Sequence, residues 1–148
     1  MVVPDLNLVV YAHVKTVPKH PEARLWWQEL MKGSVPVGIA LIVRLGFVRL
    51  LGNPALVDPV VPPEKSWAIT RGWFLRSNVV EISPTANHDE VLQQLLVESG
   101  VVSRHMNDGH LAALCLERHA ELHSNDKDFL RFPGLRLHDP LAKRKPGE

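Results

Sequence analysis

NDGHLAALCLERHAELHSNDKDFLRF, residues 107–132, is the stretch that decides the fold, because it places acidic turns on both sides of a helix and a short strand. Within it, residues 111–116 (LAALCL) are strong helix formers with apolar side chains at helical spacing. Asp108 comes just before them, where the helix dipole favours a negative charge. The pattern predicts a helix that Asp108 caps or opens, and a capping role alone would explain this aspartate.

A strand and a second acidic turn follow this helix. Residues 121–124 (ELHS) can form a short buried strand, and residues 125–128 (NDKD) supply turn-forming side chains directly after it. Asp126 therefore stands just past the carboxyl end of a strand, where the ligand crevice of an open α/β sheet lies. Asp126 and Asp128 could also be solvated turn residues without a further role.

A third acidic side chain, Asp5, lies near the beginning of the sequence. It follows a short apolar run with β-branched residues that predicts a buried strand, and Asn7 comes within one helical turn of it. Asp5 could again be only a helix cap. If Asp5, Asp108 and Asp126 converge, however, they offer the carboxylate oxygens that Mg²⁺ and Mn²⁺ prefer. Without a cation, such a cluster should raise the pKa of at least one member.

The remaining segments alternate apolar strands with helices. Further strands are predicted at residues 35–37, 79–82 and 135–137, and further helices at residues 6–13, 21–31, 39–51, 64–75 and 89–98. This order indicates a three-layer α/β/α sandwich with a short-stranded, mostly parallel central sheet. The 148 residues fit a single domain, residues 1–142, and we expect the basic tail, residues 143–148, to be disordered.

Composition narrows the class of protein only slightly. The formal net charge is +1, so no overall field indicates a nucleic-acid or membrane partner. No apolar run approaches the roughly 20 residues of a membrane span, and no secretory signal is recognisable. The single cysteine, Cys115, cannot form a disulfide within the chain. We therefore expect a cytoplasmic protein.

Histidines offer a competing type of site in the same region. A zinc site would use nitrogen and sulfur ligands, and His105, His110, His119 and His123 are close in sequence. Their spacing with Cys115 matches no common zinc motif. Cys115 also lies in the apolar part of the predicted helix, where a thiol is typical of the core and unsuited to nucleophilic attack.

Several segments of the chain together resemble the PIN-domain ribonucleases, most closely the VapC-type toxins of bacterial toxin–antitoxin pairs. In order along the chain they are VVPDLNLVVYA, GFVRLLGNP, MNDGHLAALCLERHAEL and SNDKDFLRFPGL, with DPL after the last. They span nearly the whole sequence, and SNDKDFLRFPGL is quite specific. The resemblance implies a PIN-like sandwich whose acidic side chains meet at the carboxyl ends of the strands.

The resemblance also implies roles for individual residues. Asp5 matches the first family acid, Asp108 the third and Asp126 the fourth, as metal ligands and catalytic residues. The auxiliary positions are Asp128, Ser124 and Asn7. The implied activity is that of an Mg²⁺-dependent endoribonuclease toxin, with Mn²⁺ as a substitute, in which a metal-activated water hydrolyses RNA. The implied partners are a VapB-type antitoxin and a second copy of the chain in a homodimer.

One position departs from the family pattern. The second family acid is normally a glutamate two residues before the glycine of GFVR, and this chain has Arg44 there. Arg44 could point away from a single-ion site, contact substrate phosphate, or simply extend along a helix to solvent. The alternative function is accordingly a weakened or inactive PIN-like binding module.

Overall fold

Within residues 1–143, the part of the chain that the computed structural model describes, five short strands form one sheet in the order β3-β2-β1-β4-β5. The strands are β1 (Val2–Pro4), β2 (Val37–Ala40), β3 (Val79–Ile82), β4 (Glu121–His123) and β5 (Arg136–His138). Every neighbouring pair runs parallel, which confirms the predicted sheet type. The central strands β1 and β2 are buried along their whole length, because helices cover both faces of the sheet.

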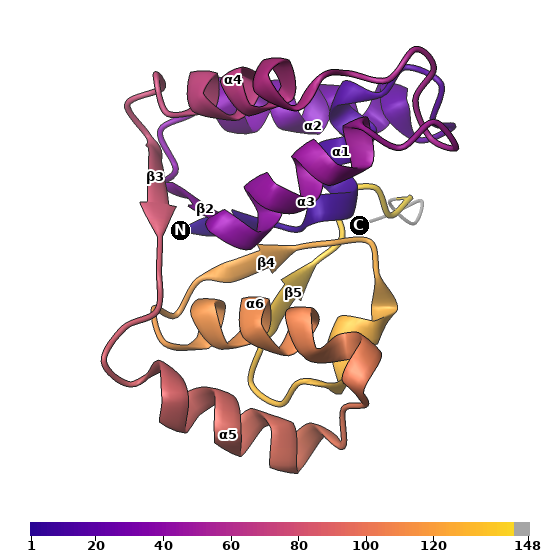
Figure 1. Cartoon of the computed structure of the whole chain (residues 1–148). Coiled ribbons are helices and arrows are strands. Elements are labelled where there is room, and N and C mark those ends of the chain that lie inside the picture. The colour runs from indigo at the N-terminus through magenta and orange to yellow at the C-terminus, as the bar shows by residue number, and fades with distance from the viewer. Residues whose placement is uncertain (144–148) are drawn as a thin grey trace.

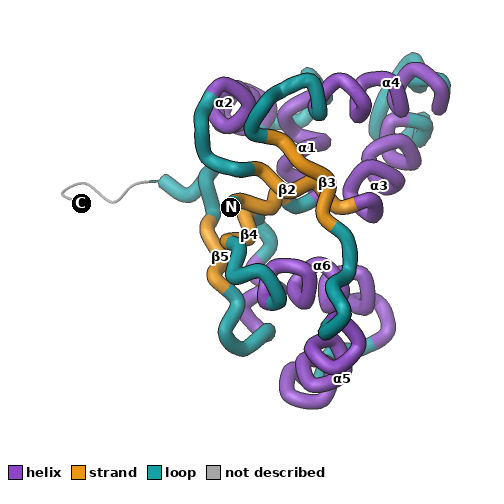
Figure 2. Tube along the Cα trace, turned by 90° about the vertical axis from the view of Figure 1, so that its left-hand side faces the viewer, coloured by secondary structure: helices purple, strands orange, loops and turns teal. Residues whose placement is uncertain are grey.

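Helices cover the two faces unequally (Figure 1). The α-helices of the described residues are α1 (Leu6–His13), α2 (His20–Lys32), α3 (Leu41–Leu51), α4 (Pro63–Trp73), α5 (His88–Ser99) and α6 (Met106–Leu116). Two short 3₁₀ helices, η1 (Ser103–His105) and η2 (Lys127–Arg131), flank the last of them. Helices α1 to α4 lie on one side of the sheet and α5 and α6 on the other, and the edge-on view in Figure 2 shows the same division. The predicted three-layer α/β/α sandwich is therefore confirmed.

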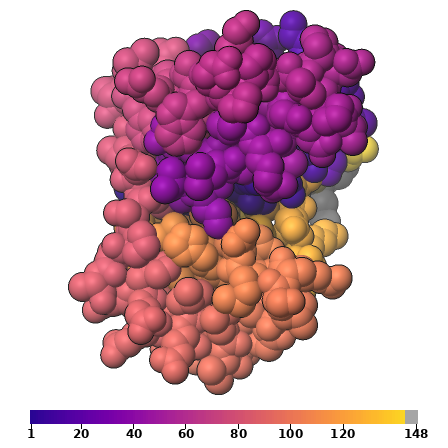
Figure 3. Space-filling view, in the orientation of Figure 1, coloured from indigo at the N-terminus to yellow at the C-terminus, as the bar shows by residue number. Residues whose placement is uncertain are grey.

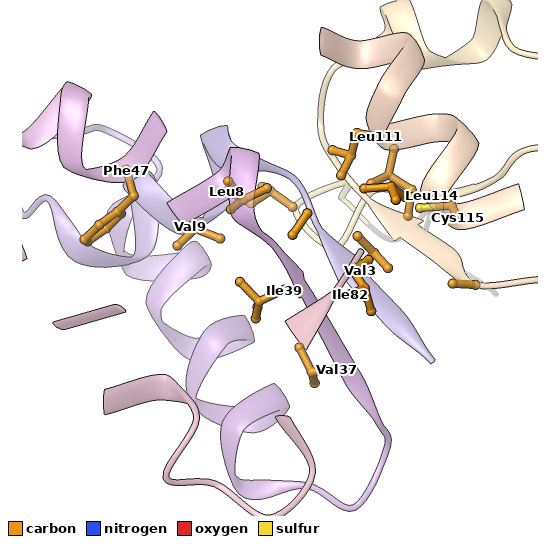
Figure 4. Packing of buried hydrophobic residues seen from close by; sticks show 14 of the residues in the cluster. Val3, Leu8, Val9, Val37, Ile39, Phe47, Ile82, Leu111, Leu114 and Cys115 are labelled. Atoms are coloured by element: carbon orange, nitrogen blue, oxygen red, sulfur yellow. The ribbon is translucent and has the colours of Figure 1, made fainter. Parts of the chain in front are cut away.

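The apolar core runs through the sheet from one helical layer to the other. Figure 4 shows Leu8, Val9 and Phe47 packing on one side, and Leu111 and Cys115 on the other. All five side chains are at most 3% exposed. Burial raises the pKa of the Cys115 thiol to about 12, so this cysteine is a core residue, as the sequence predicted.

Two differences from the predicted element boundaries affect the site. Strand β2 begins at Val37 and continues through residues 38–40, which the sequence assigned largely to the following helix. A side chain at Gly38 would approach Ile82 and Met1 to within 3.0 Å, so a glycine lets β2 lie close to its neighbours. Helix α6 begins at Met106, so Asp108 lies inside its first turn and does not cap it.

Three of the four tryptophans, Trp26, Trp27 and Trp73, are at most 9% exposed and belong to the core. Of the predicted basic tail, Lys143 is described, and residues 144–148 lie outside the described residues. No helix in residues 1–143 is both long and apolar enough to cross a membrane.

Candidate active site

Asp5 and Ser124 meet because they follow two neighbouring parallel strands. The register of β1 and β4 pairs Pro4 with His123, so the next residue of each strand lies at the carboxyl edge of the sheet. The Asp5 amide donates a hydrogen bond to the His123 carbonyl at 2.9 Å. The Ser124 hydroxyl donates to Asp5 Oδ2 at 2.7 Å, across a sequence separation of 119 residues. Sheet register thus fixes this pair.

The Asp5 carboxylate is held at the amino end of α1. It caps the helix, because its Oδ1 accepts a hydrogen bond from the Leu6 amide at 2.7 Å. The side chain is also buried, with the residue only 6% exposed. Burial raises the pKa of Asp5 to about 6; the hydrogen bonds from Ser124 and Leu6 oppose this rise, and the nearby charges of Asp108 and Asp126 add to it. The cap and the cluster expected for Asp5 therefore occur together.

This raised pKa predicts how the stability of the metal-free protein depends on pH. A carboxyl group whose pKa rises from 3.8 to about 6 on folding favours the folded state most below pH 3.8, and this contribution is lost as the pH rises through 6. The loss is on the order of 3 kcal/mol in the free energy of unfolding. Asp5→Asn should remove it and make the metal-free protein more stable than the parent at pH 8. Urea unfolding in EDTA between pH 4 and pH 8 measures this, and identical pH profiles for parent and variant would contradict it.

Asp126 is tied to the same serine. Its backbone amide donates to Ser124 Oγ at 3.0 Å, so one hydroxyl connects the Asp5 side chain to the Asp126 backbone. The Asp126 side chain caps η2 by accepting a hydrogen bond from the Asp128 amide at 2.8 Å. The Asp128 side chain is itself 51% exposed, at the outer side of the turn. The turn chemistry expected for residues 125–128 therefore orients one aspartate, Asp126, beside Asp5.

Asp108 approaches from the opposite layer, in the first turn of α6. His105 Nδ1 lies 3.4 Å from Asp108 Oδ2, and Arg104 Nε donates to His105 Nε2 at 3.1 Å. Since Nε2 accepts from Arg104, the imidazole proton is on Nδ1 and is donated to Asp108. Burial raises the pKa of Asp108; His105 lowers it, and the charges of Asp126 and Asp128 raise it. The carboxylates are therefore close enough to affect one another's ionisation.

Asp5, Asp108 and Asp126 line a single cavity of about 290 Å³. Its walls come from α1, α3 and α6, and in Figure 3 the purple residues of α3 and the orange residues of α6 meet across this face of the molecule. The other lining residues are Leu6, Asn7, Ile42, Val43, Leu45, Gly46, Arg49, Asn107 and Leu111. The structure thus brings the three predicted acids, and Asn7, to one place.

The donor set of this cavity fits a hard divalent cation. Among residues 1–143, no three histidine, cysteine, aspartate or glutamate side chains are arranged as a ready metal cage. Mg²⁺ does not need one, because it usually keeps several waters and takes only one or two protein carboxylates. Asp5 Oδ1 and Oδ2 already accept hydrogen bonds from Leu6 and Ser124, which orient the carboxylate. Burial is the main cause of the raised pKa values of Asp5 and Asp108, and the charges of neighbouring aspartates add to it.

The sequence reasoning gave three residues of this region no role at the acidic site. Arg49 and Asn107 line the cavity, and His105, considered only as a zinc ligand, contacts Asp108. A signal for Arg49 was present, because Ile42, Leu45, Gly46 and Arg49 have the 0, 3, 4, 7 spacing of one helix face. His105 lies three residues before Asp108, a spacing at which helical side chains meet.

Arg44 does not line the cavity. Its position is two residues from both Ile42 and Gly46, which places it on the opposite face of α3. The guanidinium carbon lies 3.9 Å from the centre of the Trp67 ring, and Nε donates to Thr70 Oγ1 at 3.1 Å. Arg44 therefore points away from the acids. The alternative that it extends to solvent is wrong, since the residue is 8% exposed.

The histidines considered as zinc ligands make their contacts in different places. His105 contacts Asp108, whereas His110 Nδ1 lies 3.0 Å from His88 Nε2. His123 accepts a hydrogen bond from Trp26 and contacts Glu121. His119 lies in the turn before β4 with a φ of 51°. In the described residues these four side chains do not converge on one point.

Comparison with known proteins gives the chain its family. No protein-family model matches the sequence. Ribonuclease VapC33 of Mycobacterium tuberculosis is 33% identical over 143 residues, which cover 97% of this chain and 100% of the relative.

Solved structures with lower sequence identity share the fold. One is VapC20 of Mycobacterium tuberculosis, a toxin that cleaves the sarcin-ricin loop, with a TM-score of 0.66 and 17% identity over 92% of this chain and 99% of that one. Another is VapBC2 of Rickettsia felis bound to a promoter DNA fragment, with a TM-score of 0.65 and 22% identity over 93% and 98% of the two chains. On the full-length similarity to VapC33, supported by this common fold, the chain belongs to the VapC family of PIN-domain ribonucleases.

Proposed function

We propose that this chain is the toxin of a VapBC-type pair and an endoribonuclease that depends on Mg²⁺ or Mn²⁺. The observation that carries the proposal is the single cavity at the carboxyl edge of the sheet, where Asp5, Asp108 and Asp126 arrive from three separate segments of the chain. Family membership supports a ribonuclease activity. The raised pKa values of Asp5 and Asp108 support a site built to bind a cation.

Each side chain has a distinct task in this proposal. Asp5 and Asp108 bind the ion directly, and Asp126 binds it directly or through a water. Ser124 holds the Asp5 carboxylate in place, and the Asp128 amide does the same for Asp126. When bound, the ion lowers the pKa of a coordinated water and offsets the charge that develops on the phosphodiester.

The electrostatics of the cavity make the cation necessary. Three carboxylates would repel an RNA phosphate that enters the same cavity. Asp5 is only 6% exposed, so water screens its charge poorly. A divalent cation removes both obstacles, since it neutralises the acids and attracts the phosphate. Cleavage should therefore require the ion.

The metal requirement is tested by incubating the purified chain with cellular RNA. We expect cleavage in Mg²⁺ or Mn²⁺ and none in EDTA, with activity restored by excess ion. A synthetic RNA and the DNA of the same sequence, treated in parallel, test for the preference for RNA. Cleavage that EDTA does not reduce would refute the metal dependence.

Arg44 raises a second candidate, a PIN-like binding module without catalysis. Calorimetric titration with Mn²⁺ separates the two, because a module with a degenerate site should give no heat of metal binding. The contacts of Arg44 with Trp67 and Thr70 favour the enzyme, since they keep its charge out of the cavity.

The partner in this proposal is a VapB-type antitoxin. The Rickettsia felis structure contains VapB and VapC together on DNA, which supports an antitoxin for this chain. A homodimer stays a prediction; Leu41 on α3 is 49% exposed and would be available to it.

A further inference from the structure

We propose that Arg49 binds an RNA phosphate next to the one that is cleaved. This inference rests on the proposed function and adds a substrate-binding residue to it. Arg49 lines the same cavity as Asp5, Asp108 and Asp126, but from the wall that α3 forms, near the end of that helix. The cavity therefore has an acidic side and a cationic side.

The charge of Arg49 is not used within the fold. Arg44, Arg118 and Arg131 each have a carboxylate oxygen within 4.0 Å, whereas Arg49 has none in the part of the chain that the structure describes. The side chain is also exposed. An exposed guanidinium without a carboxylate partner is free to bind an anion, and its planar set of N–H donors matches the oxygens of a phosphate.

Arg49 is also separated from the three acids. Helix α3 begins directly after β2, at the carboxyl edge of the sheet where Asp5 follows β1. Ile42 and Arg49 both line the cavity, and a rise of about 1.5 Å per residue sets them roughly 10 Å apart along the helix axis. Arg49 therefore lies at the end of the α3 wall that is farther from this edge, where it can reach the phosphate next to the one at the proposed ion.

The wall between the two charged sides suits the intervening nucleotide. Leu45 and Gly46 precede Arg49 on α3 and line the cavity with it, and Gly46 has no side chain that could fill the space. A Cβ at Gly46 would collide with the Leu6 side chain, so α1 and α3 lie close together here. The result is a mostly apolar wall leading to Arg49, along which a strand can lie.

The test compares Arg49→Ala, Arg49→Lys and Arg24→Ala with the parent. Arg24 is an exposed arginine on α2 that does not line the cavity, so Arg24→Ala is a matched control for the lost charge. In Mn²⁺, Arg49→Ala should raise the KM for a short single-stranded RNA about tenfold and leave kcat nearly unchanged. Arg49→Lys should restore part of the lost affinity, because it keeps the charge without the fork.

A second measurement does not depend on catalysis. Anisotropy of a labelled single-stranded RNA in EDTA, over a range of salt concentrations, gives the number of phosphates contacted. Losing one contact should reduce the slope of log K against log salt by about 0.7 in Arg49→Ala, and by nothing in Arg24→Ala. If no variant cleaves RNA but this difference persists, the proposed nuclease fails and the phosphate contact holds. Equal slopes and equal KM values for Arg49→Ala and Arg24→Ala would overturn the phosphate contact itself.

Discussion

Asp108→Asn is expected to reduce RNA cleavage roughly 1000-fold, because it removes one of the two carboxylates that bind the ion directly. The fold should survive the change. Asp108 does not cap α6, and its side chain is 31% exposed. The amide can still accept the hydrogen bond from His105. Measured with single-turnover cleavage of a labelled RNA in saturating Mg²⁺, the loss should appear in the chemical step.

Asp89→Asn is the control for this prediction. Asp89 also lies in the first turn of a helix, α5, and is exposed, but it lies outside the cavity. Asp89→Asn changes the net charge and the interaction with the helix dipole by the same amount as Asp108→Asn, but it should leave cleavage unchanged. Equal cleavage by Asp108→Asn and the parent would remove Asp108 from the site.

The combination of Asp5→Asn with Asp108→Asn distinguishes a shared ion from two independent roles. Residues that act through one bound ion lose activity together, so the double variant should be little worse than either single variant. Mn²⁺ should raise the melting temperature of the parent and have little effect on the double variant. Additive losses of activity would indicate that the two aspartates act separately.

The sequence predicted much of this site because parallel strands impose a simple geometry. An acid just past a buried strand must lie at the carboxyl edge of the sheet, which is how Asp5 and Asp126 could be placed in advance. To predict the hydrogen bond from Ser124 to Asp5, one would also have to know the register of β1 against β4. Register depends on the packing of the whole sheet and is not encoded locally in either strand.

The helical side of the cavity was harder to foresee. The predicted start of α3 was two residues too early, and Asp108 was expected to cap or open α6, which begins two residues before it. Spacing along a helix shows which residues share a face, but it does not show which face turns toward the cavity. Arg49 and His105 lie on these two elements or beside them, and their roles could be inferred only once α3 and α6 were placed on the sheet.

Arg44→Ala is expected to destabilise the protein by about 3 kcal/mol, the second large effect. The substitution removes the stacking on Trp67 and the hydrogen bond to Thr70, and leaves a cavity between α3 and α4. Arg49→Ala is a control on the same helix. Because Arg49 is exposed, this substitution should lower the free energy of unfolding by less than about 0.5 kcal/mol. Urea unfolding at one fixed pH gives both values.

Arg44→Glu tests the departure from the family pattern directly. A glutamate at position 44 would face Trp67 and Phe74 rather than the three aspartates. The nearby Glu81 carboxylate, which pairs with Arg44 in the parent, would repel it. A buried carboxylate without a cation is costly, so this variant should be less stable than Arg44→Ala and no more active than the parent. If Arg44→Glu instead folds well and cleaves RNA faster, position 44 reaches the cavity, and the face of α3 assigned to Arg49 is wrong. The placement of one helix face therefore determines both the structural role of Arg44 and the substrate contact of Arg49.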